Sequence, residues 1–243
     1  MPTFTQDPVS IGQDGFTASA TPVASLGALA KTRDGRVFRY AKAGVADLIA
    51  GNLVQSPAIA TAHLGIVPAV GSPLATQIVA TLGAAAAAAG QYAEGYVDVD
   101  TAPGNGYLYQ VAGHAAVLSG GVITLNLRPE DGLQIGITGT SRVGLCANPF
   151  NGVIQCPIAL TGVPVGVAGY VIPAGQYGWI QTGGPASVLV NGAPGLGVTV
   201  LNGATAPGSV DVMTTTNLVT STIVGTMLQV GVTGKNNFVF LKM

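Results

Sequence analysis

Charge is what this 243-residue chain has least of. It contains 9 Lys and Arg and 10 Asp and Glu, so 8% of its residues are charged and its formal net charge is -1. An ordinary soluble domain carries about 25% charged residues. Without a basic field we expect no direct binding of nucleic acid. Two explanations of the scarcity stay open: a neutral polar surface, or a surface covered by partners through contacts that depend little on salt.

Residues that carry chemistry are equally scarce. The two histidines, His63 and His114, have no neighbours in a metal-ligand pattern, and no phosphate-binding, dinucleotide-binding or nucleophilic-serine motif occurs. Two cysteines without nearby histidines do not make a zinc site. We therefore expect no enzyme, no cofactor and no metal.

The two cysteines, Cys146 and Cys156, are equidistant from Asn151. A three-residue loop would place them opposite each other, whereas a two-residue turn would put them out of register. Reduced thiols are the expectation in the cytosol, with a disulfide as the alternative.

Long apolar runs are also missing. No uninterrupted run reaches the roughly 18 residues that a spanning helix needs. Residues 143–210 contain no charge, but Gly, Pro, Asn and Gln interrupt them every few positions. The first residues lack the basic region and apolar core of a signal peptide. We expect no contact with a membrane and a protein that stays in the cytosol until it assembles.

Turn formers and strand formers are plentiful instead. The chain has 36 Gly and 15 Pro, with abundant Thr and Val. These features predict an all-β fold in which short antiparallel strands form sandwich- or barrel-like units. We expect an irregular extended N-terminal arm at 1–30, a β domain with hairpins at 31–160 and a second β unit at 161–243. The second unit is either separate or packed on the first as one domain.

The stretch 174–190 is the centre of this pattern, and it holds the only Trp. Alternation predicts a strand with Tyr177 and Trp179 on one face, a sharp turn at 183–185 and a second strand. The string Ala-Gly-Gln-Tyr at 174–177 also occurs at 89–92, which suggests that the two halves contain similar hairpins. The apolar segment 237–241 predicts that the C-terminal residues are tied into a sheet.

Residues 31–42 carry five of the nine basic residues. Asp34 and Gly35 predict a turn, followed by a strand with Arg36, Phe38 and Tyr40 on one face. This basic and aromatic strand meets an acidic patch on a partner, touches a packaged genome, for which five charges are few, or is a solvated edge strand protected by its charges.

The acidic residues Glu94, Asp98 and Asp100 are predicted to share one face of a strand. Paired carboxylates can do acid–base work or bind a hard cation, but a solvated face is the simpler interpretation.

Five segments resemble, in this order, a group of tailed-bacteriophage capsid proteins that decorate or cement the head. They are residues 38–44 (FRYAKAG), 52–57 (NLVQSP), 91–96 (QYAEGY), 148–153 (NPFNGV) and 176–181 (QYGWIQ). The alanine run at 84–89 and the last third of the chain lie outside the resemblance.

The resemblance implies an all-β homotrimer on the capsid exterior of the virion, present in the host cytoplasm during assembly. Its partner would be the major capsid protein, whose subunits it would bridge against the pressure of packaged DNA. The alternative is a phage tail or fibre component that binds a host surface glycan through exposed aromatic residues around Tyr107, Tyr109 or Trp179. The isolated apolar residues of the arm either dock on another subunit or belong to a loose terminus. The residues expected at an interface are Phe4, Ile11, Phe16, Arg33, Arg36, Arg39, Tyr40, Tyr177 and Trp179.

Overall fold

The computed structural model describes residues 9–10, 13–215 and 221–243. These residues divide into two compact units. Residues 59–148 form the inserted unit, and the described residues before 59 and from 149 onward form the main unit. The boundary expected after residue 160 thus falls inside the main unit, because strands before and after residue 160 pair with each other.

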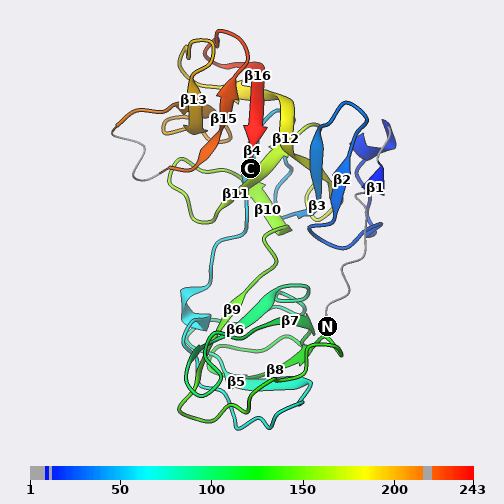
Figure 1. The fold of residues 1–243 in the computed structure, drawn as a ribbon, viewed down its shortest axis with the longest axis vertical. Helices are drawn as coiled ribbons and strands as arrows, with labels where there is room; N and C mark the ends of the chain where they lie inside the picture. The colour runs from blue at the N-terminus through cyan, green and yellow to red at the C-terminus, as the bar shows by residue number, and fades with distance from the viewer. Residues whose placement is uncertain (1–8, 11–12, 216–220) are drawn as a thin grey trace. The chain divides into compact units, whose positions relative to one another are not determined.

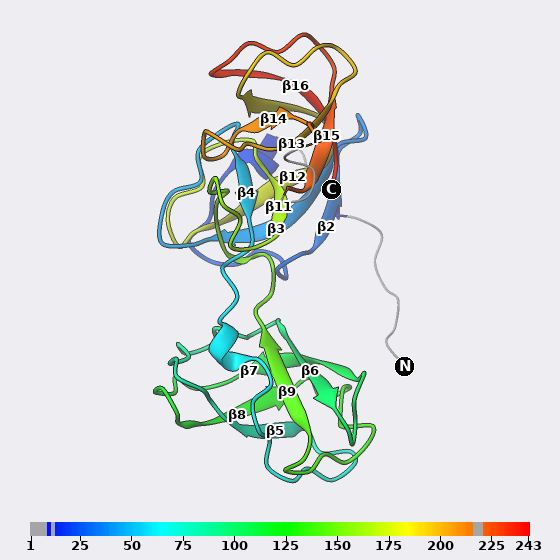
Figure 2. The same cartoon turned by 90° about the vertical axis from the view of Figure 1, so that its left-hand side faces the viewer.

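The inserted unit is a five-stranded antiparallel sheet in the order β5-β8-β7-β6-β9. Single bridges join Ile66 to Val143 of β9 and Pro68 to Ala80 of β5, so the segment around Ile66 nearly closes the sheet into a ring (Figure 2). Apolar side chains at alternate strand positions fill its interior. Its elements are the 3-10 helix η2 (Thr61–His63), β5 (Gln77–Thr81), β6 (Tyr96–Thr101), β7 (Leu108–Gly113), β8 (Val122–Leu127) and β9 (Arg142–Cys146).

The main unit is an eleven-stranded mixed sheet in the order β1-β2-β3-β10-β4-β11-β12-β14-β13-β15-β16 (Figure 1). Among the described residues the chain has two short 3-10 helices and no α-helix, which confirms the all-β prediction. The elements of this unit are β1 (Val9–Ser10), η1 (Gln13–Phe16), β2 (Leu29–Lys31), β3 (Val37–Ala43), β4 (Leu53–Gln55), β10 (Asn151–Gln155), β11 (Pro164–Ala168), β12 (Tyr177–Val190), β13 (Thr199–Asn202), β14 (Val210–Val212), β15 (Ile223–Met227) and β16 (Lys235–Lys242).

Strand β12 belongs to two closed rings of strands. Its additional pairing with β3 closes the first ring, β3-β10-β4-β11-β12, and its additional pairing with β16 closes the second ring, β12-β14-β13-β15-β16. Ile180 of β12 lies in the core of the first ring, whereas Val188 lies in the core of the second. One strand therefore contributes to two barrel-like cores.

The sharp turn predicted at 183–185 is wrong, because β12 runs without interruption through these residues. The strand pairs with β3 up to Gly183 and with β16 from Gly183 onward. Gly184 has a φ of +80°, which bends the strand, and the Gln181 amide donates hydrogen bonds to Gly183 O (3.0 Å) and Pro185 O (2.8 Å). The turn-forming residues thus redirect a continuous strand, since each half has its own partner strands.

The repeated Ala-Gly-Gln-Tyr string marks a similar turn in both units. Gly90 and Gly175 have φ values of +67° and +72°. Each turn follows a bridge, between Ala87 and Val117 in one unit and between Leu48 and Ile172 in the other. A strand begins directly at Tyr177, but the turn at the first copy continues and β6 begins only at Tyr96.

Candidate functional site: an arginine pocket beside β12

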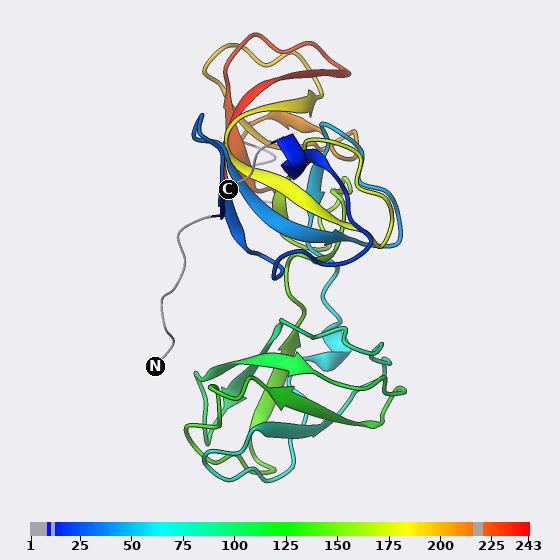
Figure 3. The ribbon, with the colours of Figure 1, turned by 90° about the vertical axis from the view of Figure 1, so that its right-hand side faces the viewer.

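The outer face of β3 and β12 carries a strip of aromatic side chains (Figure 3 shows the two strands side by side). Tyr40 is the register partner of Trp179, with ring centroids 5.0 Å apart, and it stacks on Tyr177 at 6.0 Å. This agrees with the predicted alternation, in which Phe38 shares a face with Tyr40 and Tyr177 shares a face with Trp179.

The described part of the predicted arm covers this strip on its own chain. The residues that pack against the strip or join its core are Phe16, Ala24, Leu26, Ala28 and Ala30. Tyr40 and Trp179, expected at a partner interface, are consequently only 1% and 7% exposed. Burial raises the pKa of Tyr40, whose hydroxyl accepts a hydrogen bond from the Val23 amide. These two residues belong to the core of the main unit.

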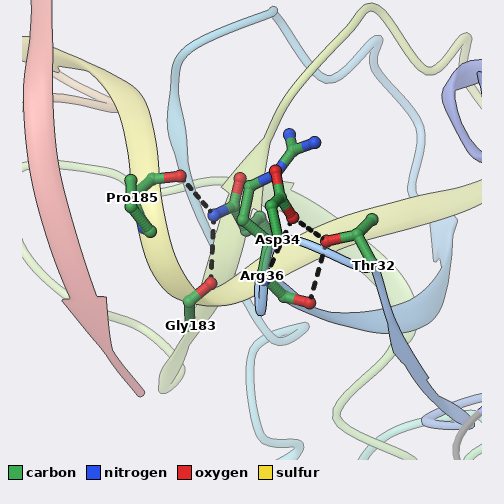
Figure 4. Close-up of polar contacts among 6 residues, drawn as sticks. Thr32, Asp34, Arg36, Gly183 and Pro185 are labelled. Carbon is green, nitrogen blue, oxygen red and sulfur yellow. Dashed lines mark hydrogen bonds and ion pairs between the residues drawn. The ribbon is translucent and has the colours of Figure 1, made fainter.

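Arg36 lies at the end of the same strip and is held by two aromatic rings and by an ion pair. Its guanidinium lies 5.7 Å from the ring centroids of both Phe16 and Phe38. Its Nε donates to Asp34 Oδ2 at 2.9 Å. The Thr32 hydroxyl, which hydrogen-bonds Asp34, and then Arg36 itself hold the pKa of that carboxyl below its usual value. Figure 4 shows this hairpin next to Gly183 and Pro185 of β12.

A pocket of about 320 Å³ opens beside Arg36. Its wall combines the aromatic rings of Phe16 and Phe238 with polar side chains from β12 and the start of β16. The residues that line it are Phe16, Arg36, Ala50, Gly51, Val167, Gly169, Gln181, Pro185, Ala186, Ser187, Asn236 and Phe238. All of them belong to the main unit. The pocket therefore presents a cation, two aromatic rings and several polar groups in one concave place.

Glycines let three of these side chains approach the backbone closely. A Cβ on Gly51 would lie 2.4 Å from Asn236 Nδ2, and one on Gly184 would lie 3.4 Å from Arg36 Cγ. Phe16 packs in the same way on Gly169, at 3.4 Å from the corresponding position. The shape of the pocket thus depends on glycines at these three positions.

The other residues predicted at an interface lie apart from the pocket. Phe4 and Ile11 lie outside the described residues. Arg33 is exposed in the hairpin before β3, and Arg39 donates from Nη1 to Gly27 O at 2.8 Å. Tyr177, half-buried, has the Lys42 ammonium 5.4 Å from its ring centroid. The basic strand β3 is not an edge strand, because β2, β10 and β12 all pair with it.

Sequence reasoning missed the pocket residues on β12 and β16. The sequence predicted that 237–241 belong to a sheet, which β16 confirms. It did not indicate which face of this strand is exposed. Phe238 and Phe240 are 57% and 39% exposed, whereas Val239 and Leu241 between and after them are buried. The only signal was the alternation itself, which does not tell the inner face from the outer.

The predicted acidic cluster is divided by the structure. Asp98 and Asp100 are exposed on one face of β6, but Glu94 lies in the preceding turn with a φ of +58°. Among the residues that the structure describes, no group of three His, Cys, Asp or Glu side chains is arranged to hold a metal ion. Both thiols are free: Cys146 is exposed in the inserted unit, and Cys156 is buried in the main unit.

Comparisons of this chain with protein-family models, with curated proteins and with solved structures gave no match. Within the described part of the chain, no helix has the length and apolarity that a membrane-spanning segment requires.

Proposed function

We propose that this chain is a structural virion protein that decorates the outer surface of a tailed-phage capsid as a homotrimer. It stabilises the shell by bridging subunits of the major capsid protein. The observation that carries the proposal is an apolar outer face on the second ring. This face, named here the β15–β16 face, consists of Ile223, Leu228, Phe238 and Phe240, which are all substantially exposed.

The β15–β16 face is well suited to a protein partner. Large apolar side chains gathered on adjacent paired strands are more often an interaction surface than scattered exposed residues are. With 8% charged residues in the whole chain, such contacts would be held by apolar and main-chain groups and would depend weakly on salt. Many modest contacts of this kind add up over a shell with many copies.

The resemblance of five segments to capsid decoration proteins supports the identity of the partner. Those segments include parts of β3, β4, β10 and β12, which are four of the five strands of the first ring. Function by contact also agrees with the scarcity of chemically active residues in the sequence.

The alternative, a tail or fibre component that binds a glycan, has less support. It calls for an exposed aromatic platform, but Trp179 and Tyr109 are 7% and 3% exposed. Tyr107 is 36% exposed and stacks on Tyr109 at a centroid distance of 6.2 Å. One partly exposed ring offers a small platform for a sugar.

Co-sedimentation of the purified protein with undecorated heads of its phage, followed by heat release of DNA, tests the proposal. We expect saturable binding at a fixed ratio to capsid subunits and a higher release temperature. Absence of binding to heads would reject decoration and direct attention to glycan arrays.

The variant Phe238→Ser tests the β15–β16 face within the same experiment. Its matched control is Leu118→Ser, which removes an exposed apolar side chain from the inserted unit. Weaker binding of the first variant alone is expected. Equal binding of both variants and the unaltered protein would leave decoration standing and reject this face as the contact.

A further inference from the structure

The guanidinium of Arg36 is held in place, but only one of its three nitrogens donates a hydrogen bond within the described residues. Its Nε donates a hydrogen bond to Asp34, and its Cζ lies 5.7 Å from the ring centroids of both Phe16 and Phe38. Among the described residues, neither Nη atom of Arg36 takes part in a hydrogen bond. Arginine has five N–H donors in a planar fork, so four of them are left for another acceptor.

The chemistry of this fork selects a carboxylate. Two terminal N–H groups of a guanidinium match the two oxygens of a carboxylate in a bidentate pair, which is stronger and more directional than a single neutral hydrogen bond. Asp34 binds through the Nε side and leaves this terminal edge open. Because Arg36 is already held in place, an incoming carboxylate has little side-chain motion to freeze.

The aromatic side of the pocket favours apolar neighbours for that carboxylate. Phe238 and Pro185 line the same pocket, and Phe240 is the register partner of Pro185. Both Phe side chains are exposed and offer no hydrogen-bond donor. A sugar carboxylate would carry hydroxyl groups over this apolar surface, whereas a peptide can place apolar side chains there.

We propose that the Arg36 pocket receives an Asp or Glu side chain, flanked by apolar residues, from a segment of the capsid shell protein. The proposal rests on the proposed function, because the shell protein is its source of the segment. In it, Arg36 binds the carboxylate through its terminal nitrogens, and the β15–β16 face covers the neighbouring apolar residues. The interface with the shell protein, otherwise nearly uncharged, thus contains one ion pair that fixes how the two proteins align.

Small molecules test the pocket without a phage head. The probe is 3-phenylpropionate, which carries a carboxylate and an apolar ring, and its matched control is the neutral amide 3-phenylpropionamide. A third probe, D-glucuronate, offers the carboxylate on a sugar. Binding is followed by NMR, through the Arg36 Nε–H signal and the backbone amides of Ser187 and Phe238. We expect saturable shifts with 3-phenylpropionate, at a Kd of about 1 mM for so small a ligand.

Variants assign the binding to Arg36. Arg36→Gln should weaken 3-phenylpropionate binding about tenfold or more, since a charge-assisted bond is lost. Arg36→Lys keeps the charge without the fork and should show an intermediate loss. Arg33→Gln removes an exposed charge of the same hairpin outside the pocket and should change binding less than about twofold.

The outcomes separate this inference from the proposed function. Equal binding of the acid and the amide, or unchanged binding by Arg36→Gln with an intact spectrum, overturns the inference. Binding of D-glucuronate without 3-phenylpropionate replaces the peptide by an acidic sugar. If the protein sediments with heads but no probe binds, the proposed decoration is supported and carboxylate binding by the Arg36 pocket is rejected. If the probe binds but heads do not, the shell protein is rejected as its source.

Discussion

Arg36 lies directly against Gly184. A Cβ placed on Gly184 would come within 3.2 Å of the Arg36 Cα and 3.4 Å of its Cγ, and Gly184 has a φ of +80°. The bend of β12 and the wall of the pocket therefore meet at one residue without a side chain.

Gly184→Ala should destabilise the main unit by about 2–3 kcal/mol, because it combines a strained backbone with a close contact. Gly175→Ala is the control, since Gly175 has a φ of +72° and no atom within 4 Å of the added Cβ. The control should cost about 1 kcal/mol, from the backbone alone. Urea unfolding followed by Trp179 fluorescence measures both. Equal losses would show that the contact with Arg36 relaxes freely.

Trp179→Ala should cost about 3–5 kcal/mol, the range for removing a large buried aromatic side chain. The reason is its place in the core beside Tyr40. Phe238→Ala, at an exposed aromatic position, should change stability by less than about 1 kcal/mol. Urea unfolding followed by circular dichroism compares the two. A small decrease in the free energy of unfolding for Trp179→Ala would contradict the core position and favour the interface role predicted from the sequence.

Stability of the inserted unit should fall in alkali. Burial raises the pKa of Tyr92 from the ordinary 10.0 to about 12. Above pH 10 the unfolded chain releases a proton that the folded unit retains, so this contribution is complete below pH 10 and is lost as pH rises toward 12. The slope from one such proton is about 1.4 kcal/mol per pH unit.

The variant Tyr92→Phe should lose this part of the pH dependence, although it also loses the hydrogen bond between the Tyr92 hydroxyl and His63. Tyr107→Phe, at a partly exposed position, is the control and should keep the dependence. Methyl NMR signals of Leu125 and Leu145 in the core report unfolding of this unit. Identical pH profiles for the two variants would contradict the assignment to Tyr92.

The two thiols should react at very different rates. Burial raises the pKa of Cys156 to about 11, so little thiolate is present near neutrality, and the group is also covered. Partial desolvation, followed by the charge of Asp98, raises the pKa of Cys146 as well, but Cys146 is an exposed residue that a reagent can reach. Iodoacetamide at pH 8 should modify Cys146 at least about a hundredfold faster. Mass spectrometry of the digested protein gives the two rates of modification. In urea, which unfolds the protein, the two rates should become similar. Similar rates in the native protein would show that the structure around Cys156 opens to the reagent.

Local patterns in the sequence predicted much of the local structure. The turn at Asp34 and Gly35 and the alternation of Arg36 and Phe38 are correct, because both depend on neighbours in the chain. The continuity of β12 was not predictable in this way. Whether Gly184 ends a strand or bends it depends on β16, whose residues lie some fifty positions later.

The pocket shows the same limit. Phe16 and Arg36 were named from the sequence as isolated apolar and basic residues, and both line it. Asn236 and Phe238 were not named, because nothing near them in the chain indicates that the second ring brings β16 to that place. The burial of Trp179 was missed for a related reason: the segment that covers it carries only small or scattered apolar residues.

The pairing of Gln55 in β4 with Ile154 in β10 makes the inserted unit equivalent to the loop of a hairpin. In an unfolded chain, closing so long a loop carries an entropic penalty that grows with the logarithm of its length. Within the inserted unit, however, Ile66 near its beginning is bridged to Val143 near its end. Once this unit has folded, the loop is about fourfold shorter, which lowers the closure penalty by about 1.2 kcal/mol. The inserted unit thus acts as an intramolecular clamp whose folding, if it comes first, accelerates closure of the first ring.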